Sequence, residues 1–220
     1  MGIIDTYAHI ITKDKIIEVN SNPNIECIIN VGMNATTSSQ IIEIAQANPK
    51  FYAACGIHPL YVYGNHNGSI TYGRVNKIFE LATSNKVVAI GEIGLDYSSG
   101  INKEYQRWIF INQIRIANEL GLPVIIQSSN TKSNEEMLNL LGKVTPEFGC
   151  VFHLSKLDFK TIETLTSLDY YISFTGPIDT ETEINKDLLL VGTNSSSMTD
   201  INSSIVLETN KNAKRLFKRL

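Results

Sequence analysis

Histidine and glutamate side chains stand where short apolar runs of this sequence end. Three of the four histidines, His9, His58 and His153, occupy such positions, and Glu92 follows the apolar run 87–90 between glycines. A lone carboxylate on a buried strand is costly, so Glu92 is expected to be paired or bound to a cation. Imidazole and carboxylate groups from different strands are ligands for zinc or manganese. A single histidine is more often structural, but His9, Glu92 and His153 together favour a metal site.

The elements that must position these groups alternate between strand and helix patterns. Strands are expected at 2–9, 25–31, 51–58, 87–90 extended to Glu92, 124–127, 150–153, 170–174 and 188–191. Helical patterns occupy 37–48, 104–120, 134–141 and 158–168, with Gly121 as the cap of the second. A loop at 60–73 leads into another helix that ends near residue 85, and a loop at 193–204 precedes a terminal helix.

Strand followed by helix, repeated about eight times, predicts an α/β protein with a parallel sheet. Right-handed crossovers and this number of units favour a single (β/α)8 TIM barrel over residues 1–220, and a doubly wound open sheet is the alternative. In a barrel, the strand ends that carry His9, His58, Glu92, Gln127 and His153 all lie at the face where barrel enzymes build their sites. Asn194, just past the last strand, belongs to the same face.

Composition limits the partners and the compartment. The formal net charge of −3 and the pI of about 5.8 give no global basic surface for nucleic acid or anionic lipid. Three widely spaced cysteines without metal-binding spacing suit buried thiols in a reducing compartment. No secretory signal and no membrane-spanning run is visible, so a cytoplasmic protein is expected. The oligomeric state is not predicted.

Several separated motifs carry a family resemblance. GIIDTYAH is similar to an opening D-x-H-x-H motif, CGIHP to G-x-HP, GCVFHLSK to HCFSG and LLLVGTN to LLLETD, and AIGEIGLDY is a close match to the most recognisable signature. The segment QSSN occupies the position of an HSRD motif. Together these motifs cover essentially the whole chain. The sequence resembles the TatD-like metal-dependent deoxyribonucleases and hydrolases, whose fold is an amidohydrolase-type TIM barrel.

The resemblance implies a two-metal site of which this chain keeps half of the ligands. His9, Glu92 and His153 match ligand positions, and the other three positions carry Tyr7, Gln127 and Asn194, the last after a one-residue insertion. Neutral groups at these positions weaken metal binding, because they remove negative charge or a strong nitrogen donor. The implied catalytic residues are Glu92, His58, which would position the substrate, and Asn194 in the place of an aspartate that activates water.

Two functions from different classes follow. The first is a metal-dependent hydrolase that acts on phosphoesters of small molecules or nucleic acid, in the manner of a deoxyribonuclease, or on other ester-like bonds. Its cofactor would be zinc, manganese or magnesium, with fewer than two ions. The alternative is a catalytically inactive, metal-free barrel that binds a ligand or a partner protein.

Other charged groups have simpler interpretations. Asp5 and Asp96 are carboxylates near the rim, and hydrogen bonding to backbone amides is the favoured interpretation of both. The basic residues 211–219 are expected to form the solvated face of the last helix, with a nucleic-acid contact as the alternative.

Overall fold

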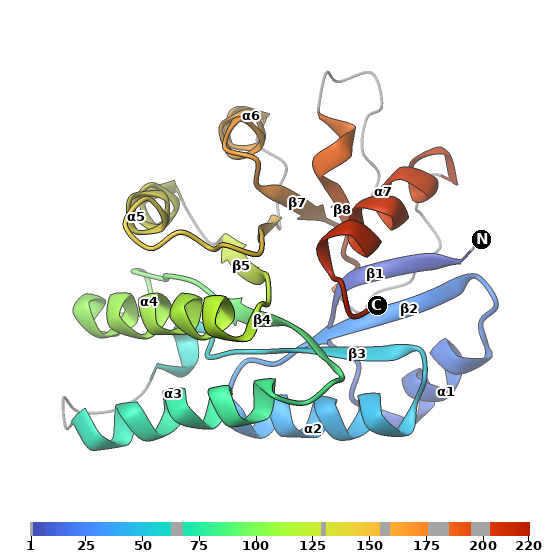
Figure 1. The fold of residues 1–220 in the computed structure, drawn as a ribbon, viewed down its shortest axis with the longest axis horizontal. Helices are drawn as coiled ribbons and strands as arrows, with labels where there is room; N and C mark the ends of the chain where they lie inside the picture. Colours follow the sequence, from blue (N-terminus) through green and yellow to red (C-terminus); the bar gives the residue numbers. More distant parts are fainter. Residues whose placement is uncertain (1, 63–67, 129–130, 155–158, 176–184, 195–202) are drawn as a thin grey trace.

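Eight parallel strands form one sheet whose spatial order follows the sequence from first to last (Figure 1). The computed structural model describes residues 2–62, 68–128, 131–154, 159–175, 185–194 and 203–220. The strands are β1 (Ile3–Ala8), β2 (Ile25–Val31), β3 (Phe51–Cys55), β4 (Val87–Ile93), β5 (Val124–Ser128), β6 (Cys150–Leu154), β7 (Tyr171–Phe174) and β8 (Leu189–Val191). This order has no switch point, so the predicted (β/α)8 barrel is confirmed and the doubly wound alternative is wrong.

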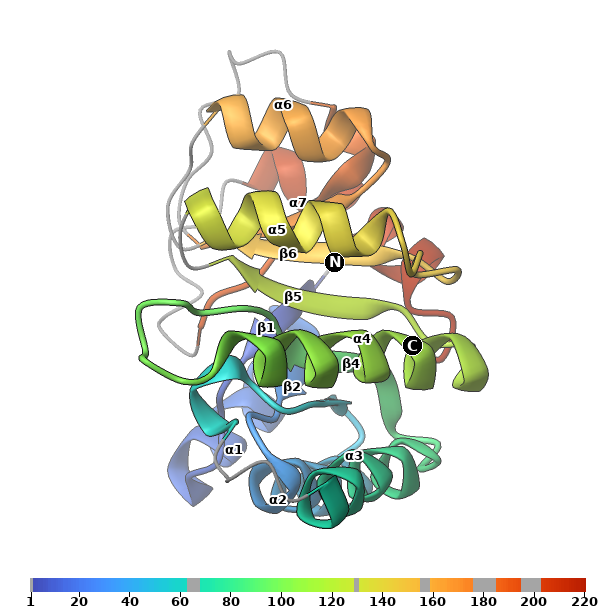
Figure 2. The same cartoon turned by 90° about the vertical axis from the view of Figure 1, so that its left-hand side faces the viewer.

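Helices surround the strands on the outside (Figures 1 and 2). They are α1 (Lys13–Ser21), α2 (Ala35–Ala47), α3 (Gly68–Ala82), α4 (Lys103–Leu120), α5 (Thr131–Leu141), α6 (Phe159–Ser167) and α7 (Ser203–Leu216), with short 3₁₀ turns η1 (Pro59–Tyr61) and η2 (Lys186–Leu188). Gly121 caps α4 in the left-handed region at φ 68°, as predicted.

Helices α1 and α3 differ most from the sequence prediction. The apolar pattern does not reveal α1, because this polar helix buries only Val19. Helix α3 starts at Gly68, inside the segment expected to be loop, and its two glycines and β-branched residues explain why its composition favours a loop. Most of the expected loop at 193–204 lies outside the described residues.

Most strands contribute at least one apolar side chain to the interior of the barrel. Ile4, Ile29, Ala54, Val88, Ile125, Val151 and Leu190 belong to one buried cluster with Ala213, Leu216 and Phe217. Helix α7 and the residue after it therefore close the amino-terminal end of the barrel. The carboxyl ends of the strands stay available for a site.

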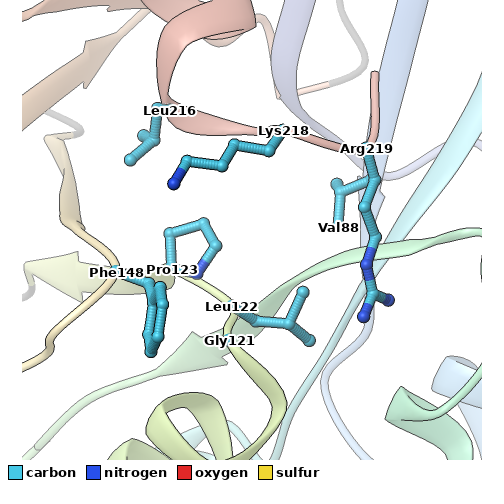
Figure 3. A pocket seen from close by; sticks show the side chains of 8 residues that line it. All are labelled: Val88, Gly121, Leu122, Pro123, Phe148, Leu216, Lys218 and Arg219. Atoms are coloured by element: carbon cyan, nitrogen blue, oxygen red, sulfur yellow. The ribbon is translucent and has the colours of Figure 1, made fainter.

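A small crevice lies at the amino-terminal end of the barrel and is lined by residues that precede β5 and β6 and by residues near the carboxyl terminus (Figure 3). Its lining includes Leu122 and Pro123, which precede β5, and Phe148, which precedes β6. Arg219 also lines it, but its guanidinium Nη1 donates to the carbonyls of Ser84 at 3.3 Å and Val87 at 2.7 Å. The crevice is therefore part of the packing beneath the barrel.

The seam between β8 and β1 is joined by individual hydrogen bonds. The hydroxyl of Thr6 donates to the carbonyl of Val191 at 2.7 Å, and the backbone N–H of Asn194 donates to the carbonyl of Tyr7 at 3.0 Å. The carboxylate of Asp5 accepts from the backbone N–H and the hydroxyl of Thr193 and from the backbone N–H of Tyr7. Asp5 thus acts through backbone amides, as predicted, and it connects the last strand segment to the first.

Candidate functional site

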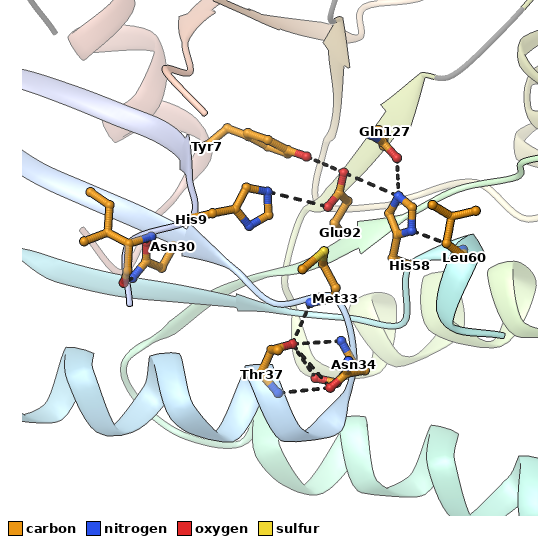
Figure 4. Close-up of polar contacts among 11 residues, drawn as sticks. Tyr7, His9, Asn30, Met33, Asn34, Thr37, His58, Leu60, Glu92 and Gln127 are labelled. Carbon is orange, nitrogen blue, oxygen red and sulfur yellow. Dashed lines mark hydrogen bonds and ion pairs between the residues drawn. The ribbon is translucent and has the colours of Figure 1, made fainter. Parts of the chain in front are cut away.

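Glu92 is the centre of a buried polar cluster at the carboxyl end of β4. The residue is 1% exposed, and its Oε1 accepts a hydrogen bond from the hydroxyl of Tyr7. The other oxygen, Oε2, lies 3.9 Å from Nε2 of His9, and Nε2 of His58 lies 3.8 Å from Oε1 (Figure 4). These two distances exceed hydrogen-bond length, so the imidazoles surround Glu92 without bonding to it directly.

The ring orientation of His58 is fixed from both sides. The backbone N–H of Leu60 donates to Nδ1 of His58 at 3.1 Å, so in the neutral ring the proton resides on Nε2. That Nε2–H donates to the side-chain oxygen of Gln127 at the end of β5. His58 is therefore held in one orientation beside Glu92, and its role of positioning a substrate stays a prediction.

Tyr7 and His153 form a parallel stack next to Glu92. Their ring centroids are 3.6 Å apart with an interplanar angle of 3°, and Nδ1 of His153 lies 3.3 Å from Oγ of Ser173. Burial and the charge of Glu92 raise the pKa of Tyr7 above its ordinary value, so the phenol stays protonated. Burial, and next the charge of His9, lower the pKa of His153 to about 3, so that ring is neutral near pH 7.

His9 is the most accessible member of the cluster, with 26% of its side chain exposed. Its ring meets the edge of Tyr7 at 5.3 Å between centroids and 87° between planes. Burial lowers the pKa of His9 below its ordinary value, although the charge of Glu92 acts in the opposite direction. A neutral imidazole near pH 7 can give a nitrogen lone pair to a metal ion.

The donor set fits one cation better than two. His9 and Glu92, whose Nε2 and Oε2 are 3.9 Å apart, are the residues that would hold one ion, as a nitrogen and an oxygen donor. In the described part of the chain, no three His, Cys, Asp or Glu side chains are grouped so that they could hold a metal. The oxygen that a second ion would need, Oε1, already accepts from Tyr7. These residues do not fit a dinuclear centre.

The structure brings most of the predicted site residues together. His9, His58, Glu92 and Gln127 are joined by the contacts in Figure 4, and His153 reaches the cluster through Tyr7. Asn194 is exposed at the rim with a positive φ of 51°, and its role stays a prediction. Sequence reasoning missed Ser173 and Thr193, which contact His153 and Asp5. Their position at the ends of β7 and β8 was the available signal.

The basic residues near the carboxyl terminus make contacts within the protein. Lys214 pairs with Glu26 at 2.5 Å, and Arg215 donates to the hydroxyl of Tyr171 at 3.0 Å. These contacts agree with a structural face on α7, and a nucleic-acid contact there stays untested. Among the described helices, none combines the length and the apolar character that crossing a membrane requires.

Comparisons with known proteins agree with this geometry. A family model described as TatD related DNase matches residues 4–218. An uncharacterized metal-dependent hydrolase of Bacillus subtilis, YabD, is 29% identical over 214 residues, which are 90% of this chain and 81% of the relative. The 3'-5' ssDNA/RNA exonuclease TatD of Erwinia tasmaniensis is 28% identical over 168 residues, 74% of this chain and 62% of the relative. The crystal structure of the TatD homolog YJJV from Escherichia coli has the same fold, with a TM-score of 0.78, 20% identity and 98% of each chain covered.

Proposed function

Because the chain belongs to the TatD related DNase family, we propose that it hydrolyses phosphoester or other ester-like bonds with the help of one divalent metal ion. Family membership confirms the TatD-like hydrolase assignment made from the sequence. The observation that carries the proposal is the buried Glu92 carboxylate with one oxygen facing His9 at 3.9 Å. This pair supplies a nitrogen and an oxygen donor of the kind that catalytic zinc or manganese sites use.

His9 and Glu92 would hold the ion, and His153, stacked on Tyr7, is a further imidazole of the cluster. Histidine donors favour zinc or manganese over magnesium, which prefers oxygen ligands. When bound, such an ion polarises a phosphoryl or carbonyl oxygen and lowers the pKa of a bound water. The neutral state of His9 and His153 near pH 7 leaves their nitrogens available for it.

The remaining residues act on the substrate. The imidazole of His58 is held by Leu60 and Gln127, and a substrate oxygen that approaches Glu92 would take the place of Gln127 as acceptor of its Nε2–H. The protonated hydroxyl of Tyr7 keeps the Glu92 carboxylate in one orientation. Asn194, in the position of a proton-accepting aspartate, cannot take the proton of an attacking water near pH 7.

The substrate class follows from the relatives and from the charge of this chain. One relative is named a 3'-5' ssDNA/RNA exonuclease, so phosphodiesters at nucleic-acid ends are candidates. The net charge of −3 does not favour tight binding of a long polyanion. We therefore propose small phosphoesters and short single strands as substrates, and slower turnover of long DNA.

A second candidate function is a metal-free binding barrel. It is favoured by the contacts of Tyr7 with Glu92 and of Gln127 with His58, because both are protein groups that engage the polar atoms of the site. Such a barrel would bind a ligand or a partner protein at the same face without hydrolysing it.

His9→Ala and His58→Ala separate the two roles in the proposed site. We expect His9→Ala to lose both metal and turnover of a chromogenic phosphodiester, since it removes a ligand. His58→Ala should keep its metal and lose turnover, by about a hundredfold, because it removes only an oriented donor. Metal content and rate are measured on the same preparations with manganese or zinc added. Equal metal content in wild type and His9→Ala would contradict the assignment, and full activity of both variants would contradict the site.

The cysteines support a cytoplasmic location within this proposal. Cys27, Cys55 and Cys150 are unpaired and buried, and burial raises the pKa of each thiol. Buried free thiols are typical of proteins in a reducing compartment.

A further inference from the structure

We infer that the hydroxyl of Tyr7 is a built-in replacement for a cation at Oε1 of Glu92, and that it restricts this site to one metal ion. A carboxylate that is 1% exposed needs a compensating partner, because burial without one is costly. Tyr7 gives that partner to one oxygen only. The inference rests on the proposed function for the existence of a metal, but not for the role of Tyr7.

Hydrogen bonds hold the backbone of Tyr7 in place, and ring contacts hold its side chain. Its backbone N–H donates to Asp5 at 3.1 Å, and its carbonyl accepts from Asn194 at 3.0 Å. Its ring lies flat on His153 and against the edge of His9. A residue fixed in this way cannot move aside at low cost, so the hydrogen bond to Glu92 is a stable part of the site.

Gly192 lies against the stack of Tyr7 and His153 and leaves space for it. A Cβ atom at Gly192 would lie 2.8 Å from Cβ of Tyr7 and 3.3 Å from Nδ1 of His153, closer than such atoms normally approach. The same Cβ would lie 2.4 Å from Oγ of Ser173. The absence of a side chain at Gly192 therefore makes room for Tyr7, His153 and Ser173 together.

The two oxygens of Glu92 consequently differ in what they can bind. Oε1 accepts from the hydroxyl of Tyr7, and Oε2 faces an imidazole at a distance that leaves space for an ion. A metal ion can bind Oε1 only where it displaces this hydroxyl and its hydrogen bond. Removal of the hydroxyl should therefore strengthen metal binding, although it removes a hydrogen bond from the protein.

Zinc titration of Tyr7→Phe tests this inference, with Tyr171→Phe as the matched control. This control removes a phenol hydroxyl that accepts a hydrogen bond from Arg215 at the start of β7. We expect Tyr7→Phe to bind zinc about tenfold more tightly than wild type, the size of one hydrogen bond to a charged group. Its melting temperature should be lower than wild type in chelator and rise further with zinc. The control should match wild type in its zinc affinity.

A second variant, Tyr7→His, keeps the inference testable if Tyr7→Phe does not fold. Tyr7→His keeps a ring for the stack with His153 and replaces the hydroxyl donor by a nitrogen, so we expect it to take up one more zinc ion than wild type. Zinc affinity unchanged in Tyr7→Phe, or no additional zinc in Tyr7→His, would overturn the inference. Should wild type bind no zinc while Tyr7→Phe does, the replacement of a cation by Tyr7 is supported, but the restriction to one ion is overturned together with the proposed metal dependence of the natural chain.

Discussion

Glu92→Gln is expected to abolish metal uptake and to reduce phosphoester turnover by a factor on the order of 10³. The substitution keeps the size of the side chain and an oxygen that can accept from Tyr7, but it removes the negative charge that faces His9. Stability in chelator should not fall, because the variant no longer buries a carboxylate. Turnover, metal content and thermal unfolding of the same preparation give the three readouts.

Glu26→Gln is the matched control for this prediction. Glu26 makes its ion pair with Lys214 at the start of β2, at the other end of the barrel from Glu92. We expect the control to keep both metal and activity. Wild-type turnover in Glu92→Gln would show that the cluster around this residue does not carry the reaction.

Asp5→Ala is expected to lower the free energy of unfolding by about 2–4 kcal/mol at pH 7. Asp5 is fully buried, and its carboxylate accepts from Tyr7 and Thr193 across the seam between β1 and β8. Without it, these buried donors lose their partner. Asp5→Asn keeps an acceptor oxygen and is expected to be at least as stable as wild type at pH 7. Denaturant unfolding of both variants checks the contrast, and equal losses would contradict it.

The pKa of Asp5 predicts the direction in which the free energy of unfolding changes with pH. Burial raises the pKa of Asp5 from 3.8 to about 6, although its hydrogen bonds act in the opposite direction. The native state therefore holds a proton that the unfolded state releases between these two values. Protonation of Asp5 stabilises the native state below about pH 4, and this part of the stability, about 3 kcal/mol, is lost as the pH rises through about 6. The hydrogen bonds that Asp5 accepts from Tyr7 and Thr193 are a separate contribution, which Asp5→Ala removes at pH 7.

Asp5→Asn should flatten this slope, since the amide does not titrate. Unfolding free energies of wild type and Asp5→Asn measured from pH 4 to pH 7 give the comparison. Parallel curves for the two proteins would show that Asp5 does not titrate in this range.

Strand ends could be predicted from the sequence because buried strands are short and nearly continuous apolar runs. On this basis the sequence places His9, His58, Glu92 and Gln127 on one face, and the barrel brings them into contact. Helix α1 could not be predicted, since a helix that buries one side chain has almost no apolar period.

The contacts within the site were less accessible to sequence reasoning. Tyr7 and Gln127 were recognised as replacements for metal ligands, but nothing in the spacing indicates that each would engage another site residue. The stack of Tyr7 on His153 depends on the space at Gly192, which belongs to a different strand end and is fixed only by the closure of the barrel. Such contacts arise from three-dimensional proximity, whereas the sequence pattern reports the face of a strand.

The metal content of the protein purified without chelator tests the single-ion site most directly. Elemental analysis of wild type and of Glu92→Gln should give one equivalent of zinc, manganese or iron in wild type and none in the variant, with both proteins folded. Two equivalents in wild type would contradict the role of Tyr7 at Oε1 of Glu92. No metal in wild type, and none taken up on titration, would contradict a metal-dependent hydrolase and favour the binding barrel.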